Sequence, residues 1–175
     1  MSTDDPLLPL LLAAREGNDR ALTELVRRTQ PVLWRVCRDL GTDGDAADLV
    51  QETYERMLRA MHSYEGRAPV RPWLLRIARN VCADAVRRNQ RRRRLIERAA
   101  ASLEPEARDN ADRSIAPLVA ALDRDRFEAF VLTQHVGLSY EEAAQVLNCP
   151  VGTIRSRVAR ARTDLRAALR AADSA

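Results

Sequence analysis

The sequence predicts an all-α protein of two small helical domains joined by a flexible linker, the C-terminal one a helix-turn-helix. Apolar residues recur at helical spacing through most of the 175 residues, and no segment alternates as a β-strand does. A polar, charged stretch without this repeat separates two helical parts, and a pair of capped helices ends the second. We therefore place the N-terminal domain at 7–95, the linker at 96–114 and the C-terminal domain at 115–172.

The composition indicates an acidic partner bound by a local basic surface. The pI is near 9.5 although the net charge is only +4, and every basic residue is Arg. Cys37, Cys82 and Cys149 are isolated, so we expect a reduced, cytoplasmic protein with no disulfide, metal or other cofactor. The leucine-rich run at 7–12 is too short to span a bilayer, so no membrane insertion is expected.

Three helices are expected before residue 42. The first covers about 7–16, and Asn18 caps the second. Pro31 suits the first position of a third helix, which Gly41 ends. Trp34 is expected to lie in the core or to be partly buried.

An acidic helix is predicted at 43–61. Its apolar residues share one side, whereas Asp48, Gln51, Glu52 and Glu55 lie on the opposite side. Such a face is either an ordinary solvated surface or a docking site for a partner that presents arginines. No companion nucleophile or base accompanies these acids, so catalysis by them has little support.

A loop at 62–72 contains Gly and two prolines, and a basic helix resumes at Trp73. Arg76, Asn80 and Arg87 lie on one side of this helix, and the arginine run 91–94 follows. With Tyr64 in the preceding loop, the segment is suited to hold a nucleic-acid strand by its phosphates and to receive unstacked bases.

The C-terminal domain contains the strongest local signals. Asp123 is a candidate cap for a helix at 124–136. Ser139 and Glu142 form a capping box for the next helix, Asn148 suits a left-handed end, and Pro150 suits the start of the last helix. These signals predict a helix-turn-helix.

The last helix has a smooth outer strip that could enter a DNA major groove. The strip is made of Gly152, Ser156, Ala159, Arg160 and Thr163, and it is flanked by Arg155, Arg162 and Arg166 on one side and Arg157 on the other. Guanidinium groups at these positions could reach phosphates or guanine edges.

Three motifs, DAADLVQETYERM, RPWLLRIARNVCAD and GLSYEEAAQVLNCPVGTIRSRVARAR, together resemble the bacterial sigma factors of the extracytoplasmic-function type. The resemblance covers nearly the whole chain apart from the N-terminal tip and the linker. It implies a non-enzymatic subunit that binds the β′ and β subunits of core RNA polymerase, recognises minus-35 and minus-10 promoter DNA, and helps to open the minus-10 region. An anti-sigma factor is implied as a further partner.

The resemblance also assigns residues. By position it assigns polymerase docking to Asp48, Gln51 and Glu52, with Glu55 on the same face. It assigns base capture to the loop 64–70, with Tyr64, Glu65, Gly66 and Arg67, and contacts to minus-10 DNA to Arg76 and Asn80, with Arg87 farther along. It assigns contacts to minus-35 DNA to Thr153, Arg155, Ser156 and Arg160, with Arg157 and Ala159 on the same helix. Pro72 and the pair Leu122 and Asp123 depart from the family pattern, as does the loop sequence, so no promoter sequence is transferred.

Two other classes of function remain open at this stage. A stand-alone DNA-binding regulator needs only the final domain, and leaves the acidic helix and the basic helix unexplained. An enzyme such as a DNA recombinase needs a nucleophile with a base or a phosphate-binding loop, and no such motif is found in the sequence.

Overall fold

The computed structural model describes residues 5–41, 46–100 and 122–173, and all regular structure within these ranges is helical. The elements are α1 (Leu8–Arg15), α2 (Asp19–Leu40), α3 (Ala46–Ala60), a 3₁₀ turn (Met61–Ser63), α4 (Val70–Ala100), α6 (Arg124–Phe130), a π-helical turn (Val131–His135), α7 (Tyr140–Leu147) and α8 (Val151–Asp173). The predicted all-α class is confirmed. Of the predicted linker 96–114, residues 96–100 belong to α4, and residues 101–114 lie outside the described residues, as does the predicted helix start at 115–121.

Helix α2 corrects one prediction, because Pro31 lies inside a continuous helix and does not open a new one. Asn18 caps α2 as expected, its side-chain oxygen accepting from the Ala21 N–H at 3.1 Å. Pro31 is exposed, and buried Leu25 and Leu33 continue one apolar side across it. The energy of burying that side outweighs the roughly 3 kcal/mol that an internal proline costs a helix.

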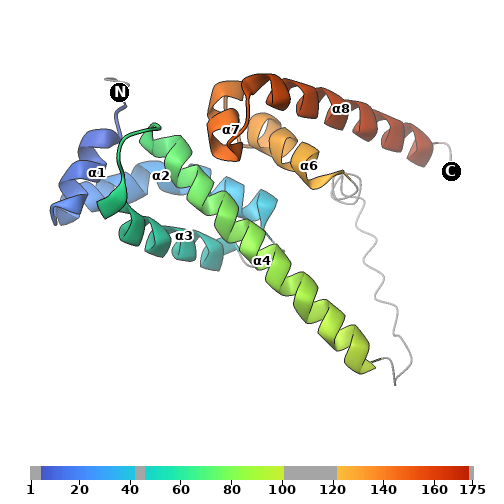
Figure 1. Ribbon diagram of the computed structural model, residues 1–175, viewed down its shortest axis with the longest axis horizontal. Coiled ribbons are helices and arrows are strands. Elements are labelled where there is room, and N and C mark those ends of the chain that lie inside the picture. Colours follow the sequence, from blue (N-terminus) through green and yellow to red (C-terminus); the bar gives the residue numbers. More distant parts are fainter. Residues whose placement is uncertain (1–4, 42–45, 101–121, 174–175) are drawn as a thin grey trace.

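Helices α2 and α3 pack on the first half of α4, and α1 packs on α2 (Figure 1). Their core is filled by large apolar side chains that are almost inaccessible to water, namely Leu11, Leu25, Leu33, Met57, Leu74, Leu75 and Val81. Trp34, by contrast, is 43% exposed, so the prediction of a buried or partly buried tryptophan overstates its burial. Its helical position lies at the edge of the apolar side of α2.

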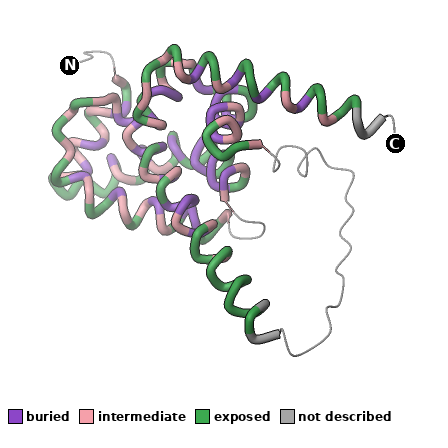
Figure 2. The backbone as a smooth tube through the Cα atoms, turned by 45° about the vertical axis from the view of Figure 1, so that its right-hand side comes forward, coloured by how far each residue is buried: buried purple, intermediate pink, exposed green. Residues whose placement is uncertain are grey.

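The sequence predicts that helix α4 begins at Trp73, but the helix begins three residues earlier, at Val70. It also continues beyond residue 95, the predicted end of the N-terminal domain. Pro72 is compatible with this start because a proline is tolerated in the first turn, where N–H groups have no helical partner. Residues 90–96 are all exposed, and this end of α4 extends away from the helical body (Figure 2).

The helix-turn-helix signals of the sequence are confirmed. The Ser139 hydroxyl accepts from the Glu142 N–H at 3.1 Å, and the Glu142 carboxylate accepts from the Ser139 N–H at 2.9 Å. Asn148 has φ 50° and ψ 52°, the left-handed conformation that ends α7. The helix expected at 124–136 ends as an α-helix at Phe130 and continues as a π-helical turn to His135.

The two domains share one hydrophobic core, which the sequence alone does not predict. Helix α7 packs on α4, and the π-helical turn contacts α2. Buried residues from both domains, such as Ala78 of α4 and Leu132 of the π-helical turn, belong to the same cluster. The helix-turn-helix therefore lies directly against the basic helix of the N-terminal domain (Figure 1).

Candidate functional site

The acidic face predicted on α3 is exposed, with one exception. Asp48, Gln51 and Glu55 are solvent-exposed, and the Gln51 amide donates to the Glu55 carboxylate at 3.3 Å. Glu52 instead accepts from Arg56 at 2.6 Å and lies 3.3 Å from Arg88 of α4. Three of the four predicted docking residues are thus accessible to a partner, whereas Glu52 also joins α3 to α4.

The pKa values of Glu52 and Asp84 are consistent with ion pairs that join α3 to α4. Partial burial opposes ionisation of Glu52, but Arg56 and Arg88 together outweigh it, and the pKa of the Glu52 carboxyl lies below its usual value. Arg56 also holds Asp84 of α4 at 2.9 Å, and its hydrogen bond is the main cause of the lowered pKa of Asp84. The carboxylates stay charged at neutral pH and fix the spacing of the two helices.

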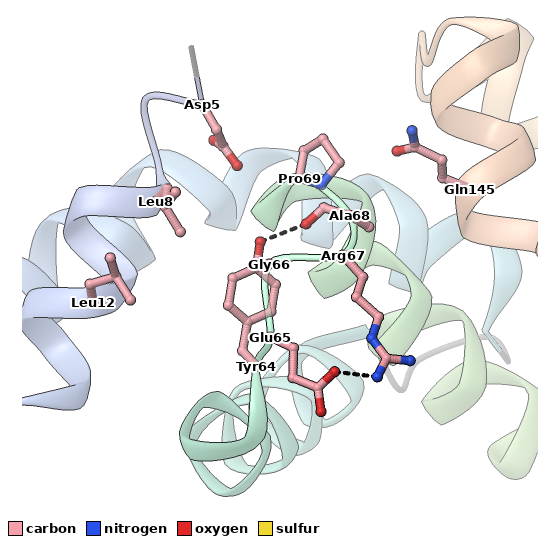
Figure 3. A pocket seen from close by; sticks show the side chains of 10 residues that line it. All are labelled: Asp5, Leu8, Leu12, Tyr64, Glu65, Gly66, Arg67, Ala68, Pro69 and Gln145. Carbon is pink, nitrogen blue, oxygen red and sulfur yellow. Dashed lines mark hydrogen bonds and ion pairs between the residues drawn. The ribbon is translucent and has the colours of Figure 1, made fainter. Parts of the chain in front are cut away.

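The predicted base-capture residues line a cavity of about 560 Å³. One wall is the loop 64–69, and the opposite wall is formed by Leu8 and Leu12 of α1 (Figure 3). Gln145 of α7 lies at the edge of the same cavity. The lining combines apolar side chains with the polar groups of Asp5, Glu65, Arg67 and Gln145, so it offers a nucleobase both apolar surface and hydrogen-bonding partners.

The loop 64–70, hereafter the capture loop, is held in shape by its own side chains. The Tyr64 hydroxyl donates to the Ala68 carbonyl at 2.6 Å, and the Tyr64 ring lies 4.9 Å from the ring of Trp73. Burial, and to a smaller degree Asp5, raises the pKa of Tyr64, so its hydroxyl stays protonated as a donor. Gly66 has φ +70°, which a side chain would disfavour.

Asp5 closes the capture loop from the N-terminal segment, and the sequence predicts no role for it. Its carboxylate accepts from the Val70 N–H at 2.6 Å and from the Leu7 N–H at 3.0 Å. The first bond joins two residues 65 positions apart. No local signal could have indicated such a pair.

The predicted minus-10 residues on α4 are exposed but differ in their partners. Among the described residues, no carboxylate pairs with Arg76. Asn80 accepts weakly from Arg79 at 3.3 Å, and Arg87 is bound to Asp84 at 2.5 Å. Arg76 and Asn80 are therefore available to DNA, whereas Arg87 would first have to leave Asp84. Glu65 and Arg67 pair with each other at the rim of the cavity.

A buried carboxylate joins the helix-turn-helix to α4. Glu128 of α6 is only 3% exposed, and it accepts from Arg79 of α4 at 2.9 Å and from Arg124 at 2.9 Å. A second, more exposed pair links Arg71 and Glu142 at 3.4 Å. The sequence gives no sign of either cross-domain pair, because both depend on the packing of α6 and α7 on α4.

The predicted recognition helix, α8, has the orientation that its apolar repeat indicates. Ile154, Val158 and Ala161 are buried, whereas Ser156, Ala159 and Arg160 are exposed on the other side. Arg155 is exposed as well, and no carboxylate within the described ranges binds Arg155 or Arg160. The half-buried Thr153 accepts through its carbonyl from the Ser156 hydroxyl at 2.9 Å.

Arg157 differs from the other predicted minus-35 residues. Its guanidinium binds Asp125 of α6 and lies 3.7 Å from the sulfur of Cys149, and its side chain is 24% exposed. Its first role in this arrangement is therefore to hold α8 against α6 and the turn. Of the predicted minus-35 arginines, Arg160 in the smooth strip and Arg155 beside it remain exposed.

The residues that the structure describes, 5–41, 46–100 and 122–173, bear on two other kinds of site. No helix in these ranges is long and apolar enough to cross a membrane. Within the same ranges, no group of three or more His, Cys, Asp or Glu residues could hold a metal ion.

Comparison with known proteins covers both domains. Residues 25–92 match the family model described as Sigma-70 region 2, and residues 113–165 match Sigma-70, region 4. The chain is 42% identical over 173 residues to the ECF RNA polymerase sigma factor SigC of Mycobacterium tuberculosis, covering 94% of this chain and 91% of that protein. It is 39% identical to the ECF RNA polymerase sigma factor EcfG of Rhodopseudomonas palustris, over 74% of each chain.

Two solved structures also resemble the chain. The chain resembles CnrH in its complex with the cytosolic domain of CnrY, with a TM-score of 0.74, 32% identity and coverage of 96% of this chain and 99% of that one. It also resembles the sigma factor RpoE bound to the anti-sigma factor NepR from Bartonella quintana, with a TM-score of 0.62, 28% identity and coverage of 85% and 96%.

Proposed function

The chain belongs to the extracytoplasmic-function sigma factors, which direct RNA polymerase to specific promoters, and we propose that it does so through three separate surfaces. The observation that carries this proposal is that an exposed acidic helix face, a cavity large enough to hold a base and an arginine-bordered helix occur in one chain. The proposed domains are 7–95 for polymerase docking and minus-10 DNA, and 115–172 for minus-35 DNA, with 96–114 between them.

The first surface is the acidic face of α3, which docks on core polymerase. Asp48, Gln51 and Glu55 supply the exposed contacts, and the chemistry of the face suits a basic helical element of the β′ subunit. Glu52 supports the surface by holding α3 on α4 through Arg88.

Reversing Asp48 and Glu55 to Arg tests this docking. Both side chains are exposed and make no ion pair within the described residues, so the fold should survive the change. We expect at least tenfold weaker binding of core polymerase, because two attractive charges become repulsive. Glu16→Arg, a charge reversal at the exposed end of α1, is the matched control. Unchanged binding by the double variant would remove the assignment.

The second surface is the capture loop with the start of α4, which receives an unstacked minus-10 base. Extruding a base costs a few kcal/mol, which a preformed pocket and strand-binding charges must offset. The pocket is the cavity between α1 and the capture loop, and Arg76 and Asn80 face solvent on the helix that follows. The Tyr64 and Ala68 hydrogen bond keeps the pocket formed before DNA arrives.

Run-off transcription on two templates tests strand opening. Shortening the capture loop, or replacing Arg76 and Asn80 with Ala, should abolish transcription from a duplex promoter while leaving polymerase docking intact. Activity should partly recover on a template whose minus-10 region is already mismatched, because the pairing cost has been removed. Arg35→Ala, which removes an exposed arginine of α2, is the control. Equal defects on both templates would show that the loop does not open DNA.

The third surface is the exposed strip of α8, which enters the major groove of the minus-35 element. Arg155 and Arg160 supply forked donors for guanine or phosphate, and Ser156 and Ala159 keep the approach smooth. Thr153 lies at the start of the same helix. Arg157 holds the helix in place through Asp125.

The expected partners and cellular location follow from the family to which the chain belongs. The solved relatives CnrH and RpoE are bound to CnrY and to an anti-sigma factor respectively, and both match this chain over most of its length. We therefore expect an anti-sigma factor to bind this chain as well. The protein works with RNA polymerase in the cytoplasm and has no chemistry of its own, since the polymerase forms the phosphodiester bonds.

Core polymerase separates this proposal from a stand-alone regulator or a DNA-modifying enzyme. The chain alone should bind duplex promoter weakly and should cleave or join no DNA, whereas its complex with core polymerase should start transcription at defined sites. Mapping transcription starts after overproduction gives both promoter elements from the shared upstream sequences. Strong, specific binding of duplex promoter without polymerase would favour the regulator.

A further inference from the structure

Asp5 forms hydrogen bonds at the start of two helices, α1 and α4. The Asp5 carboxylate accepts from the Leu7 N–H at 3.0 Å, and the Asp5 carbonyl accepts from the Leu8 N–H at 3.1 Å, where α1 begins. The second carboxylate oxygen accepts from the Val70 N–H at 2.6 Å, where α4 begins. Asp5 thus acts as an end cap for α4 from a distant part of the chain.

The bond to Val70 lies at the point where the capture loop becomes a helix. Val70 is completely buried, so an unpaired N–H there would lose its hydrogen bond to water without a replacement. The other end of the loop is fixed by the Tyr64 hydroxyl on the Ala68 carbonyl. Between them, Gly66 adopts φ +70°, and nothing lies within 4 Å of the position that a Cβ would take there. The loop is therefore fixed at its ends and open in its middle.

The N-terminal segment also forms part of the cavity. Leu8 and Leu12 line the side opposite the capture loop, and Asp5 lies between this wall and the loop (Figure 3). This segment precedes residues 25–92, the part that matches the Sigma-70 region 2 model. The pocket thus contains residues from outside the matched region.

We propose that Asp5 is a positioning residue for minus-10 base capture, which sets the distance between the capture loop and the α1 wall of the pocket. The inference rests on the proposed function of the capture loop. Asp5 acts through the Val70 N–H and the start of α1. A carboxylate suits this role because it accepts two charge-assisted hydrogen bonds, one on each oxygen.

Two substitutions separate the charge of Asp5 from its shape. Asp5→Asn keeps one acceptor oxygen of the same reach, whereas Asp5→Ala removes both acceptors. Loss of a charge-assisted bond of this kind corresponds to about tenfold in an equilibrium. We therefore expect Asp5→Ala to weaken base capture about tenfold, and Asp5→Asn to lie between Asp5→Ala and the wild type. Asp19→Asn is the matched control, because it neutralises another N-terminal carboxylate at the start of α2.

The measurement uses the full chain bound to core polymerase. The probe is a fork-junction DNA whose single-stranded minus-10 segment, of the sequence found by start mapping of the wild type, carries 2-aminopurine at the captured base. Weaker probe binding and a smaller fluorescence change, with core polymerase binding unchanged, are the expected results. Hydrogen exchange at the peptide containing Val70 should become faster in Asp5→Ala, since its N–H loses its acceptor.

The outcomes separate this inference from the proposed function. If a loop-shortened chain loses the probe but Asp5→Ala binds it as the wild type does, the role of Asp5 is refuted and base capture by the loop remains. Equal losses of probe binding and of polymerase binding in Asp5→Ala would also refute it, because they would show a general loss of structure. If the loop-shortened chain binds the probe normally, base capture by the loop fails and the role of Asp5 fails with it.

Discussion

The capture loop and the helix-turn-helix hold their DNA-facing residues in opposite ways. The loop is closed by a hydrogen bond between Asp5 and Val70, which are 65 positions apart. The helix-turn-helix is closed by Ser139 and Glu142, three positions apart, and by the left-handed conformation of the single residue Asn148. One site thus depends on contacts distant in sequence, whereas the other is built from neighbouring residues.

This difference matches what each site has to do. A surface that enters a major groove needs only a helix of known orientation, which capping and an apolar side can set locally. A pocket for one extruded base needs two walls at a fixed separation, and those walls come from different parts of the chain. We therefore expect distant substitutions to affect strand opening more than they affect minus-35 recognition.

Glu128 departs from this pattern, because it belongs to the helix-turn-helix domain but forms an ion pair with Arg79 of α4, which is distant in sequence. We expect Glu128→Ala to lower the free energy of unfolding by about 3 kcal/mol, since it leaves Arg79 and Arg124 without their buried partner. Chemical denaturation measures the change. Glu141→Ala, an exposed acid of α7, is the control and should change stability by less than about 0.5 kcal/mol. Similar effects for both would show that the helix-turn-helix does not need α4.

Arg160→Ala probes the local site itself. If Arg160 makes a forked base contact, its loss should weaken promoter binding by the polymerase complex by about 2 kcal/mol and relax preference at one minus-35 position. Titration against promoter variants measures both effects, and capture of a minus-10 probe should not change. The control is Arg35→Ala, which removes an exposed arginine of α2 that lies on none of the three proposed surfaces. A uniform loss across all sequences for Arg160→Ala would indicate a phosphate contact.

Ser139→Ala tests whether the helix-turn-helix is stabilised by its own capping residues independently of the capture loop. Removing this cap should lower the free energy of unfolding by about 1 kcal/mol, because the Glu142 N–H loses its acceptor. Ser139→Asp, which retains an acceptor, should recover most of it. Combining Ser139→Ala with Asp5→Ala should give additive losses if the two sites are independent. A clear departure from additivity would show that the capture loop and the helix-turn-helix are coupled in stability.

The smallest effect concerns pH and the ion pairs between α3 and α4. The pKa values of Glu52 and Asp84 are lowered in the folded state, so their contribution is complete above the unfolded-state pKa and is lost as pH falls through the lowered folded-state value. We expect Arg56→Met to be less stable than the wild type by about 0.5 kcal/mol at pH 7. The difference should shrink in acid and at high salt. A difference independent of pH would mean that Arg56 stabilises by packing alone.

Much of the molecule follows from the sequence alone. The all-α class, the cap at Asn18, the capping box at Ser139 and the helix end at Asn148 are all confirmed. These features depend on residues within one helical turn of each other, so spacing and residue type are enough to determine them. The outward strip of α8 follows in the same way, from the period of its apolar residues.

Tertiary structure alone decided the rest. Pro31 lies inside α2 because burial of the side shared by Leu25 and Leu33 outweighs a local helix-breaking signal. Asp5 and Glu128 acquire their roles from helices that meet only in the folded chain. A hydrogen bond between residues far apart leaves no periodic pattern in the sequence, since its energy depends on where the two helices are packed.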